Sequence, residues 1–215
     1  MNFTKEQLRL YLVTDRRYLE GRNLIDVVMQ SIEGGVTMVQ LREKDITARE
    51  FIELAHALKT KLSLYNKNHS LHIPLIINDR IDIALAVDAD GVHIGQSDMP
   101  YEEARRLLGY DKIVGLSVEN LSDVIEANAV DVDYIGISPV FATPTKTDTA
   151  LPFGLDGLRS AVNISIHPTV AIGGINISNA HEVMQAGADG IAVVSAILAS
   201  TNPTEATKQL LIKRS

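Results

Sequence analysis

Residues 169–195 read TVAIGGINISNAHEVMQAGADGIAVVS and contain one complete unit of the pattern that fills the chain. Two β-branched runs, Thr169–Ile172 and Gly190–Val194, flank a segment of helical period. Ser178 is a candidate N-cap of that helix, and Gly187 is a candidate C′ residue. The pattern predicts a strand, a helix and a second parallel strand joined by short connections.

The same alternation extends over the whole chain, and every candidate strand precedes a segment that could be helical. The candidate strands are Leu10–Thr14, Met38–Arg42, Leu75–Asn78, Gly91–Ile94, Ile113–Leu116, Tyr134–Ile137, Thr169–Ile172 and Gly190–Val194. Eight βα units in 215 residues predict an α/β protein, a single-domain (β/α)8 TIM barrel over residues 1–215. A doubly wound open sheet has the same alternation and is the alternative.

The helix between the second and third strands is the best specified. Thr47-Ala48-Arg49-Glu50 is a capping box, in which hydroxyl and carboxylate satisfy each other's free amides. Apolar residues then follow at helical spacing on one face. They are Phe51, Leu54, Ala55, Leu58 and Leu62.

Composition narrows the function. A formal charge of −7 would repel nucleic acid and anionic membranes, so we expect no partner of either kind. Zero cysteines exclude thiolate chemistry but leave a hard cation such as Mg²⁺ possible. No window approaches the roughly 18 uninterrupted apolar residues of a membrane-spanning helix. These features predict a soluble, cytoplasmic protein, and a homo-oligomer is compatible with them.

Two cations and an amide lie at the end of the second candidate strand and just beyond it. Because strand side chains alternate in direction, Gln40, Arg42 and Lys44 should share one face, with Leu41 on the other. Ligands bind at the carboxyl ends of the strands in such folds, and this set suits a phosphate or diphosphate. The alternative is an exposed strand end with solvated charges.

Two carboxylates lie on neighbouring connections of the same rim. Asp79 follows the third strand, and Asp98 lies in the loop after the fourth. A carboxylate pair can hold Mg²⁺, with phosphate and water completing its shell. Either residue could instead cap the next helix, because both stand just before helical segments and Pro100 is typical of a first turn.

Two further regions suit phosphate binding. The long connection 138–149 offers hydroxyls at Thr143 and Thr145 and a cation at Lys146, and the less favoured alternative is a mobile surface loop. Gly173-Gly174 and Val194-Ser195 follow the last two strands, where backbone amides can bind a phosphate. A lone histidine inside a strand, His93, is expected to be a hydrogen-bonded structural residue rather than a catalytic one.

Taken in order, these motifs resemble the thiamine-phosphate synthase (thiamine-phosphate pyrophosphorylase) family over nearly the whole chain. The matching pieces are YLVTD at 11–15, QLREK at 40–44, INDR at 77–80, GVHIGQSD at 91–98, GLS at 115–117, TPTK at 143–146, GGI at 173–175 and VS at 194–195.

The resemblance implies a TIM barrel that joins a hydroxymethylpyrimidine diphosphate to a hydroxyethylthiazole phosphate. Pyrophosphate would leave in a Mg²⁺-assisted dissociative substitution, and both substrates would be small molecules. The pyrimidine diphosphate contacts implied are Gln40, Leu41, Arg42, Glu43, Lys44, Asn78, Ser117 and Lys146. The thiazole phosphate contacts implied are Thr143, Pro144, Thr145, Gly174, Val194 and Ser195. Arg42, Lys44, Lys146 and Ser117 would carry the reaction, with Asp79 and Asp98 as magnesium ligands.

One position departs from the family pattern. Many relatives have a histidine two residues after the serine that matches Ser117, whereas this chain has Glu119. The related thiazole tautomerases tend to use that histidine and to lack the metal aspartates, so Glu119 with Asp79 and Asp98 favours a synthase. A non-catalytic protein that binds the same ligands is a further alternative, although no carboxylate or cation of the motifs is lost.

Overall fold

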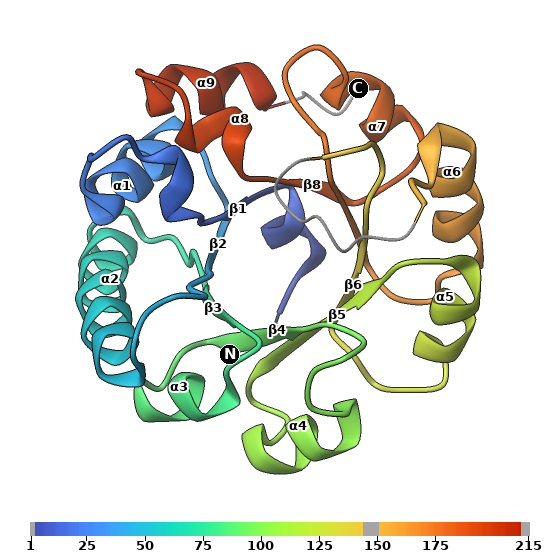
Figure 1. Cartoon of the computed structure of the whole chain (residues 1–215), viewed down its shortest axis with the longest axis horizontal. Coiled ribbons are helices and arrows are strands. Elements are labelled where there is room, and N and C mark those ends of the chain that lie inside the picture. The colour runs from blue at the N-terminus through green and yellow to red at the C-terminus, as the bar shows by residue number, and fades with distance from the viewer. Residues whose placement is uncertain (1–2, 144–150, 212–215) are drawn as a thin grey trace.

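A computed structural model of the chain describes residues 3–143 and 151–211. Its strands form one closed parallel barrel in chain order, surrounded by helices (Figure 1). The strands are β1 (Leu10–Val13), β2 (Met38–Leu41), β3 (Leu75–Asn78), β4 (Gly91–Ile94), β5 (Ile113–Val118), β6 (Tyr134–Ile137), β7 (Thr169–Ile172) and β8 (Gly190–Val193). Pairing of β1 with β8, in the register Tyr11 to Ala192, closes the barrel and excludes the open sheet. The predicted barrel is confirmed.

The described helices lie outside the strands, as expected of repeated βα units. They are α1 (Leu24–Gly34), α2 (Ala48–His69), α3 (Ile81–Ala86), α4 (Tyr101–Leu108), α5 (Leu121–Ala127), α6 (Gly154–Ile164), α7 (Ala180–Gln185), α8 (Ser195–Leu198) and α9 (Pro203–Leu210), with short 3₁₀ helices η1 (Lys5–Leu8) and η2 (Arg16–Tyr18). The capping box of α2 forms as predicted, because Thr47 Oγ1 accepts from the Glu50 amide at 3.3 Å and Glu50 Oε2 accepts from the Thr47 amide at 2.8 Å.

Two local expectations are corrected. Helix α7 begins at Ala180 after Asn179, so Ser178 is not its N-cap. The reason is a turn organised by asparagines, in which Ser178 Oγ donates to Asn176 Oδ1 at 2.6 Å. Gly187 does lie just beyond α7 with a φ of +103°, as predicted for C′. Strand β5 continues to Val118 rather than ending at Leu116, because Val118 still pairs with Ile137 of β6.

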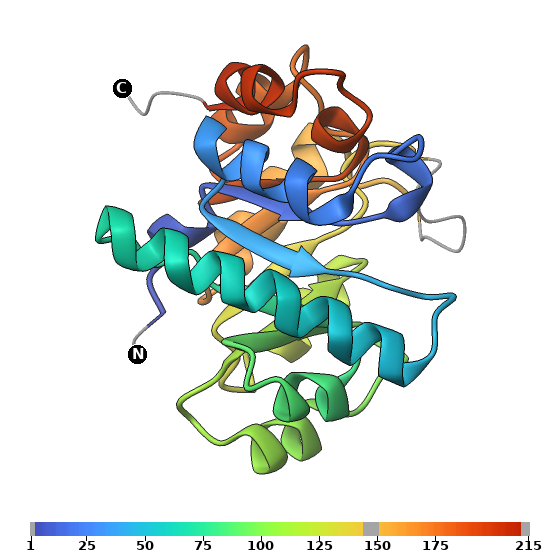
Figure 2. The same cartoon turned by 90° about the vertical axis from the view of Figure 1, so that its left-hand side faces the viewer.

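The apolar core has two parts. The larger part fills the space between the barrel and its helices, and the smaller lies inside the barrel. The inner part includes Leu8 of η1, and Phe3 stacks on Tyr134 with ring centroids 5.8 Å apart. In Figure 2 the β2 arrow points away from η1, so the N-terminal segment covers the amino end of the barrel. The carboxyl ends of the strands are left for a ligand site.

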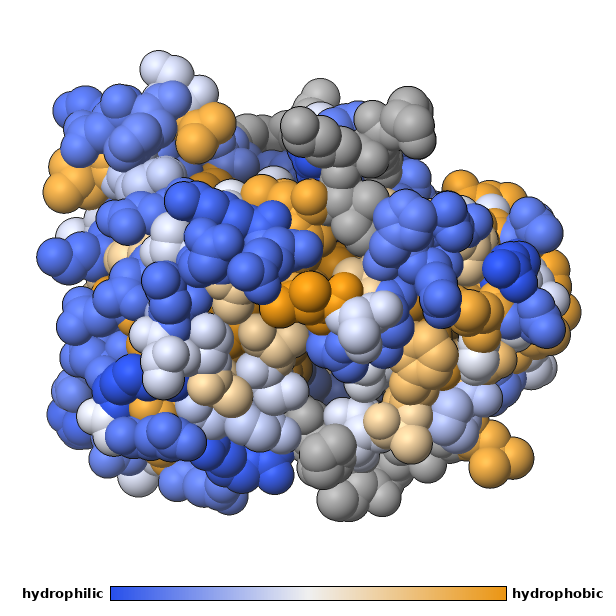
Figure 3. All heavy atoms as spheres, turned by 90° about the horizontal axis from the view of Figure 1, so that it is seen from above, coloured by the Kyte–Doolittle hydropathy of each residue, from blue (hydrophilic) through white to orange (hydrophobic). Residues whose placement is uncertain are grey.

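Figure 3 shows one face of the molecule, on which hydrophilic side chains lie on both sides of a narrower strip of hydrophobic ones. Within the described ranges, none of the helices combines the length and the apolar character that crossing a bilayer requires.

Gly115→Ala is expected to destabilise the fold. Gly115 lies on β5, and a Cβ there would stand 2.1 Å from Tyr134 Cζ and 2.6 Å from His93 Nδ1. Both rings lie beside the barrel wall with little room to move, so we expect a loss on the order of 3 kcal/mol in the free energy of unfolding. Urea unfolding measures it, and an unchanged midpoint would contradict the packing described.

Candidate active site

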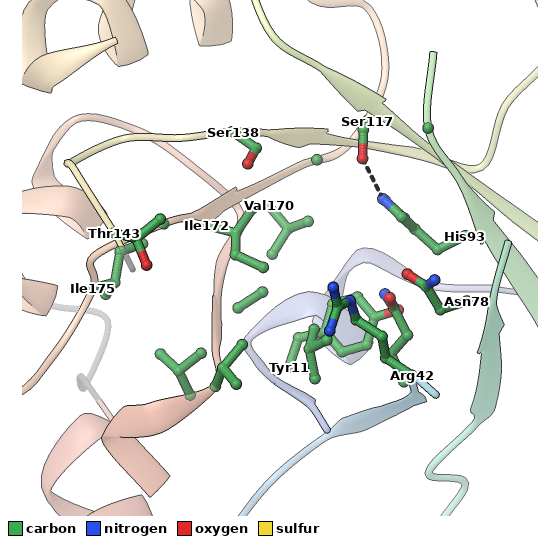
Figure 4. A pocket seen from close by; sticks show the side chains of 18 of the residues that line it. Tyr11, Arg42, Asn78, His93, Ser117, Ser138, Thr143, Val170, Ile172 and Ile175 are labelled. Carbon is green, nitrogen blue, oxygen red and sulfur yellow. Dashed lines mark hydrogen bonds between the residues drawn. The ribbon is translucent and has the colours of Figure 1, made fainter. Parts of the chain in front are cut away.

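A cavity of about 760 Å³ opens at the carboxyl ends of the strands. Its volume is in the range of small-molecule sites. Most of the predicted site residues that the structure describes line it. They are Gln40, Arg42, Lys44, Asn78, Asp79, Asp98, Ser117, Thr143, Gly174, Val194 and Ser195. Figure 4 shows Arg42, Asn78, His93 and Ser117 converging on this space from different strands.

Two predicted contacts lie outside this lining. The side chain of Leu41 is fully buried in the outer core, because the alternation of β2 turns it away from Gln40 and Arg42. Glu43 is turned toward η2, where its Oε1 accepts from Arg16 Nε at 2.8 Å. The expectation that these two side chains contact a ligand is therefore not supported. Pro144, Thr145 and Lys146 lie outside the described residues.

Arg42 forms an ion pair with the buried Asp15. An Arg42 Nη1 to Asp15 Oδ2 contact of 3.3 Å joins residues that follow β2 and β1, and Asp15 is only 5% exposed. Arg17 also donates to Asp15, through Nε at 3.0 Å. Burial acts to raise the pKa of Asp15, but the hydrogen bonds and charge of Arg17, with the charge of Arg42, outweigh burial and lower it. The carboxylate is thus ionised and orients the guanidinium at the cavity.

The carboxylate pair forms as predicted. The Lys44 ammonium lies 2.5 Å from Asp79 Oδ2, Asp98 Oδ2 accepts from the Gly95 amide at 2.7 Å, and the two carboxyl groups hydrogen bond to each other. Neither caps a helix, because α3 is preceded by Arg80 and α4 by Pro100. The capping alternative is therefore wrong for both aspartates.

The charges of the pair are arranged asymmetrically. Burial acts to raise the pKa of Asp79, but hydrogen bonds from Lys44 and Asp98 and the charge of Lys44 lower it overall. Burial and the neighbouring Asp79 raise the pKa of Asp98, despite its bond from Gly95. Two adjacent carboxyl groups whose pKa values are shifted in opposite directions offer a position that a cation can take. No group of three or more His, Asp or Glu suited to a metal occurs among the described residues, so a bound ion would depend on ligand phosphate and water.

The opposite side of the cavity is glycine-rich. Gly173 and Gly174 have φ angles of +104° and +66°, which glycine adopts without strain. A Cβ on Gly174 would stand 2.8 Å from the Ala142 carbonyl oxygen, so the loops after β6 and β7 meet here. Val194 and Ser195, after β8, line the same end. Backbone this close to a cavity suits the binding of a phosphate.

A chain of hydrogen bonds crosses the cavity floor inside the barrel. Gln40 Nε2 donates to the Tyr11 hydroxyl at 2.8 Å, which contacts the Tyr134 hydroxyl at 2.9 Å. Tyr134 contacts His93 Nδ1 at 3.0 Å, and His93 Nε2 contacts Ser117 Oγ at 2.8 Å. His93 is hydrogen-bonded, as expected, and it also lines the cavity beside Ser117 (Figure 4).

Sequence reasoning missed several lining residues. Tyr11 lies inside a strand and has the pattern of a core residue. Gln96, whose Nε2 donates to the Ser117 carbonyl at 2.6 Å, and Ser138 and Asn176 follow strand ends. Glu119 also lines the cavity, and its amide donates to Asp123 Oδ2 at 2.7 Å. All of these residues except Tyr11 lie just beyond a strand end, and that position is the signal that could have identified them.

Fold and site together define a (β/α)8 barrel whose cavity is lined by cations and a carboxylate pair at one end and by a Gly-Gly loop at the other. Residues 10–197 match the family described as thiamine monophosphate synthase. The chain belongs to this family, which confirms the resemblance of its motifs.

Individual relatives agree. The chain is 54% identical over 205 residues to a thiamine-phosphate synthase of Albidiferax ferrireducens, covering 95% of this chain and 91% of that one. It is 53% identical over 203 residues to the synthase of Vibrio parahaemolyticus, covering 94% and 96%. Its structure matches a thiamine phosphate pyrophosphorylase from Pyrococcus furiosus with a TM-score of 0.85 and 39% identity, covering 96% and 95%.

Proposed function

We propose that the chain is a thiamine-phosphate synthase, a transferase that joins a 4-amino-5-hydroxymethylpyrimidine diphosphate to a hydroxyethylthiazole phosphate. The C–O bond to the diphosphate breaks, pyrophosphate leaves with the electron pair, and the thiazole nitrogen forms the new C–N bond. The observation that carries the proposal is one cavity with cations and paired carboxylates at one end and a Gly-Gly loop at the other. That arrangement suits two phosphorylated ligands held end to end.

The pyrimidine diphosphate is proposed to bind at the β2, β3 and β5 end. Arg42 offers a planar fork of donors to the diphosphate, and Lys44 offers a point charge. Charge develops on the departing pyrophosphate, so cations placed there stabilise the transition state more than the ground state. Gln40, Asn78 and Ser117 line the same side. Lys146 is proposed as a further cation on the leaving group.

The thiazole phosphate is proposed to bind at the glycine-rich end. Amides after β7 and β8 would take its phosphate, through Gly174, Val194 and Ser195. Thr143, with Pro144 and Thr145, is proposed to complete this subsite. The thiazole nitrogen is then directed toward the pyrimidine end of the same cavity.

A magnesium ion is proposed as the cofactor, held by Asp79 and Asp98. Support comes from the adjacent carboxyl groups and from the raised pKa of Asp98 beside Asp79. When bound, Mg²⁺ would neutralise charge on the diphosphate. Lys44 contributes from the protein side, because its ammonium contacts Asp79 and faces the same space.

An assay with both phosphorylated substrates, scoring thiamine phosphate and pyrophosphate, tests the proposal. We expect the two products in equal amounts with Mg²⁺ present, and at least a tenfold lower rate after a chelator removes it. Absence of both products would overturn the synthase, and isomerisation of the thiazole phosphate alone would favour a tautomerase. Full activity in chelator would remove the metal from the proposal.

We further propose that residues 1–215 act as one catalytic domain, because the eight strands close a single barrel and all of them supply the cavity wall or its floor. A cytoplasmic location and a homo-oligomeric state belong to the same proposal. Light scattering on the purified chain measures the second.

Asp15→Asn is expected to lower kcat/KM for the pyrimidine diphosphate about tenfold. The amide keeps the shape of the side chain but removes the buried charge that orients Arg42. A charged hydrogen bond contributes about 1.5–3 kcal/mol, and only part of this loss falls on Arg42, because Asp15 also binds Arg17. Asp156→Asn is the matched control, because it breaks an exposed aspartate–arginine pair with Arg159. Equal activity in both variants would show that Asp15 does not orient Arg42.

A further inference from the structure

The chain of hydrogen bonds on the cavity floor has a direction. Gln40 Nε2 can only donate, so the Tyr11 hydroxyl accepts from it. Either hydroxyl of the Tyr11–Tyr134 contact could donate by geometry alone, but the described residues give the buried Tyr11 proton no other acceptor, so we assign it to Tyr134. By the same reasoning Tyr134 donates to Nδ1 of His93 at 3.0 Å. His93 then accepts at Nδ1, which places its ring proton at Nε2.

The direction determines what the two ends of the chain offer to a ligand. His93 Nε2–H donates to Ser117 Oγ at 2.8 Å, so the hydroxyl proton of Ser117 is directed elsewhere and is available as a donor. Gln40 uses its amide nitrogen for Tyr11, which leaves its amide oxygen as the acceptor on the cavity side. The floor thus presents an acceptor from β2 and a donor from β5.

The surroundings keep this arrangement intact. Tyr11 and Tyr134 are buried at 1% and 0% exposure, and burial raises the pKa of both hydroxyls above the ordinary range. Both hydroxyls therefore keep their protons at neutral pH. Phe3 and His93 each stack on the Tyr134 ring, with ring centroids 5.8 and 5.5 Å from that of Tyr134.

Two strand glycines provide the space. A Cβ on Gly115 would lie 2.4 Å from the Tyr134 hydroxyl oxygen, and one on Gly136 would lie 3.1 Å from His93 Cε1. Glycine weakens a strand interior, so its use on two adjacent strands marks a place where side chains must approach the wall closely. The barrel wall is thus fitted to Tyr134 and His93.

We infer that Tyr134 and His93 are positioning residues that fix the hydrogen-bonding polarity of Gln40 and Ser117 and so select an aminopyrimidine ring. This inference rests on the proposed function. An aminopyrimidine has an amino donor and a ring-nitrogen acceptor, which complement the Gln40 oxygen and the Ser117 hydroxyl. In the oxo analogue an oxygen acceptor replaces the amino donor, and a ring N–H donor replaces the ring-nitrogen acceptor. The oxygen would then face the Gln40 oxygen and the N–H would face the Ser117 hydroxyl proton, so both contacts become unfavourable. Tyr134 acts on the ligand only through its neighbours.

The tautomer of His93 tests the direction of the chain without any substrate. Nitrogen NMR of protein with labelled histidines at about pH 8 reports the tautomer, and the His93 signal is assigned as the one that disappears in His93→Gln. We expect this signal to show the Nε2–H form. The Nδ1–H form in the unaltered protein would overturn the inference. Gln40→Glu keeps the shape but can only accept at this pH, so it is expected to reverse the chain and convert His93 to Nδ1–H. A tautomer unchanged by that substitution would also overturn it.

Ligand discrimination tests the selectivity. Tyr134→Phe removes the donor to His93, and we expect kcat/KM for the pyrimidine diphosphate to fall about 10- to 100-fold with the KM for thiazole phosphate unchanged. Calorimetry gives the Kd of the oxo pyrimidine diphosphate divided by the Kd of the amino one. We expect this ratio to be at least about tenfold smaller in Tyr134→Phe than in the unaltered protein. An unchanged ratio would overturn the inference.

Tyr101→Phe is the matched control, because its hydroxyl donates to the Asp131 carbonyl outside the cavity. It is expected to change neither the His93 signal nor the ratio. If the unaltered chain makes no thiamine phosphate, the proposed function fails, whereas the tautomer measurement still decides the direction of the hydrogen-bond chain.

Discussion

Asp79→Asn is expected to lower kcat by about 100-fold or more while the fold stays intact. The amide keeps the volume of the side chain but removes the negative charge that pairs with Lys44 and that would hold Mg²⁺. Asp98→Asn removes the second carboxylate and is expected to act in the same direction. Steady-state rates at saturating concentrations of both substrates measure the effect, because a loss of the cation acts on the departing pyrophosphate.

The stability of these variants separates a catalytic role from a structural one. Neither aspartate caps a helix, and an ion pair with a half-exposed lysine contributes about 0–1 kcal/mol, so the melting temperature should change by only a few degrees. Asp82→Asn is the control, because Asp82 forms an exposed pair with Arg80 close by in the chain. Full activity in the Asp79, Asp98 double variant would refute the metal assignment.

The barrel could be predicted from the sequence because its strands are short apolar runs between helical segments. The boundaries that differed depended on tertiary pairing. Ser117 has the polarity of a loop residue, yet β5 continues through it because Gly136 of β6 pairs with it. The start of α7 depends on Asn176 and Asn179, whose side chains organise the preceding turn in a way that capping preference at Ser178 does not reveal.

The rim of the site was predictable for a simple geometric reason. A period of two from Gln40 in β2 predicts that Arg42 and Lys44, which follow the strand, lie on its side of the chain, and all three line the same opening as Asp79. The same period argues against the side chain of Leu41 as a contact, although the family resemblance had included it. The alternation of side chains along the strand therefore placed Leu41 correctly, whereas its membership of the 40–44 motif did not.

The cavity floor was not predictable, because its contacts join residues far apart in the chain. Tyr11 and Tyr134 are separated by 123 positions, and each has the character of a core residue in its own strand. Only closure of the barrel places their hydroxyls 2.9 Å apart. Likewise, nothing near Asp15 in the sequence indicates that it orients Arg42, which follows the next strand.

Arg42→Ala is expected to lower kcat/KM for the pyrimidine diphosphate by about 10² to 10³. The side chain of Arg42 is 22% exposed, compared with 51% for Lys44, so its charge is less screened by water and its direction is set by Asp15. Arg42→Lys keeps the charge but loses the planar fork, and we expect it to recover only part of the activity. A loss confined to the KM for thiazole phosphate would place Arg42 at the other subsite.

Combining this change with Asp15→Asn shows whether the two residues act as a unit. If Asp15 works only by orienting the guanidinium, it has nothing to orient once Arg42 is alanine, and the double variant should be no slower than Arg42→Ala alone. Multiplied losses would mean that Asp15 acts independently, for instance through Arg17. Non-additive losses, measured as kcat/KM in the four proteins of this cycle, would show that the orientation of Arg42 by Asp15 contributes to catalysis.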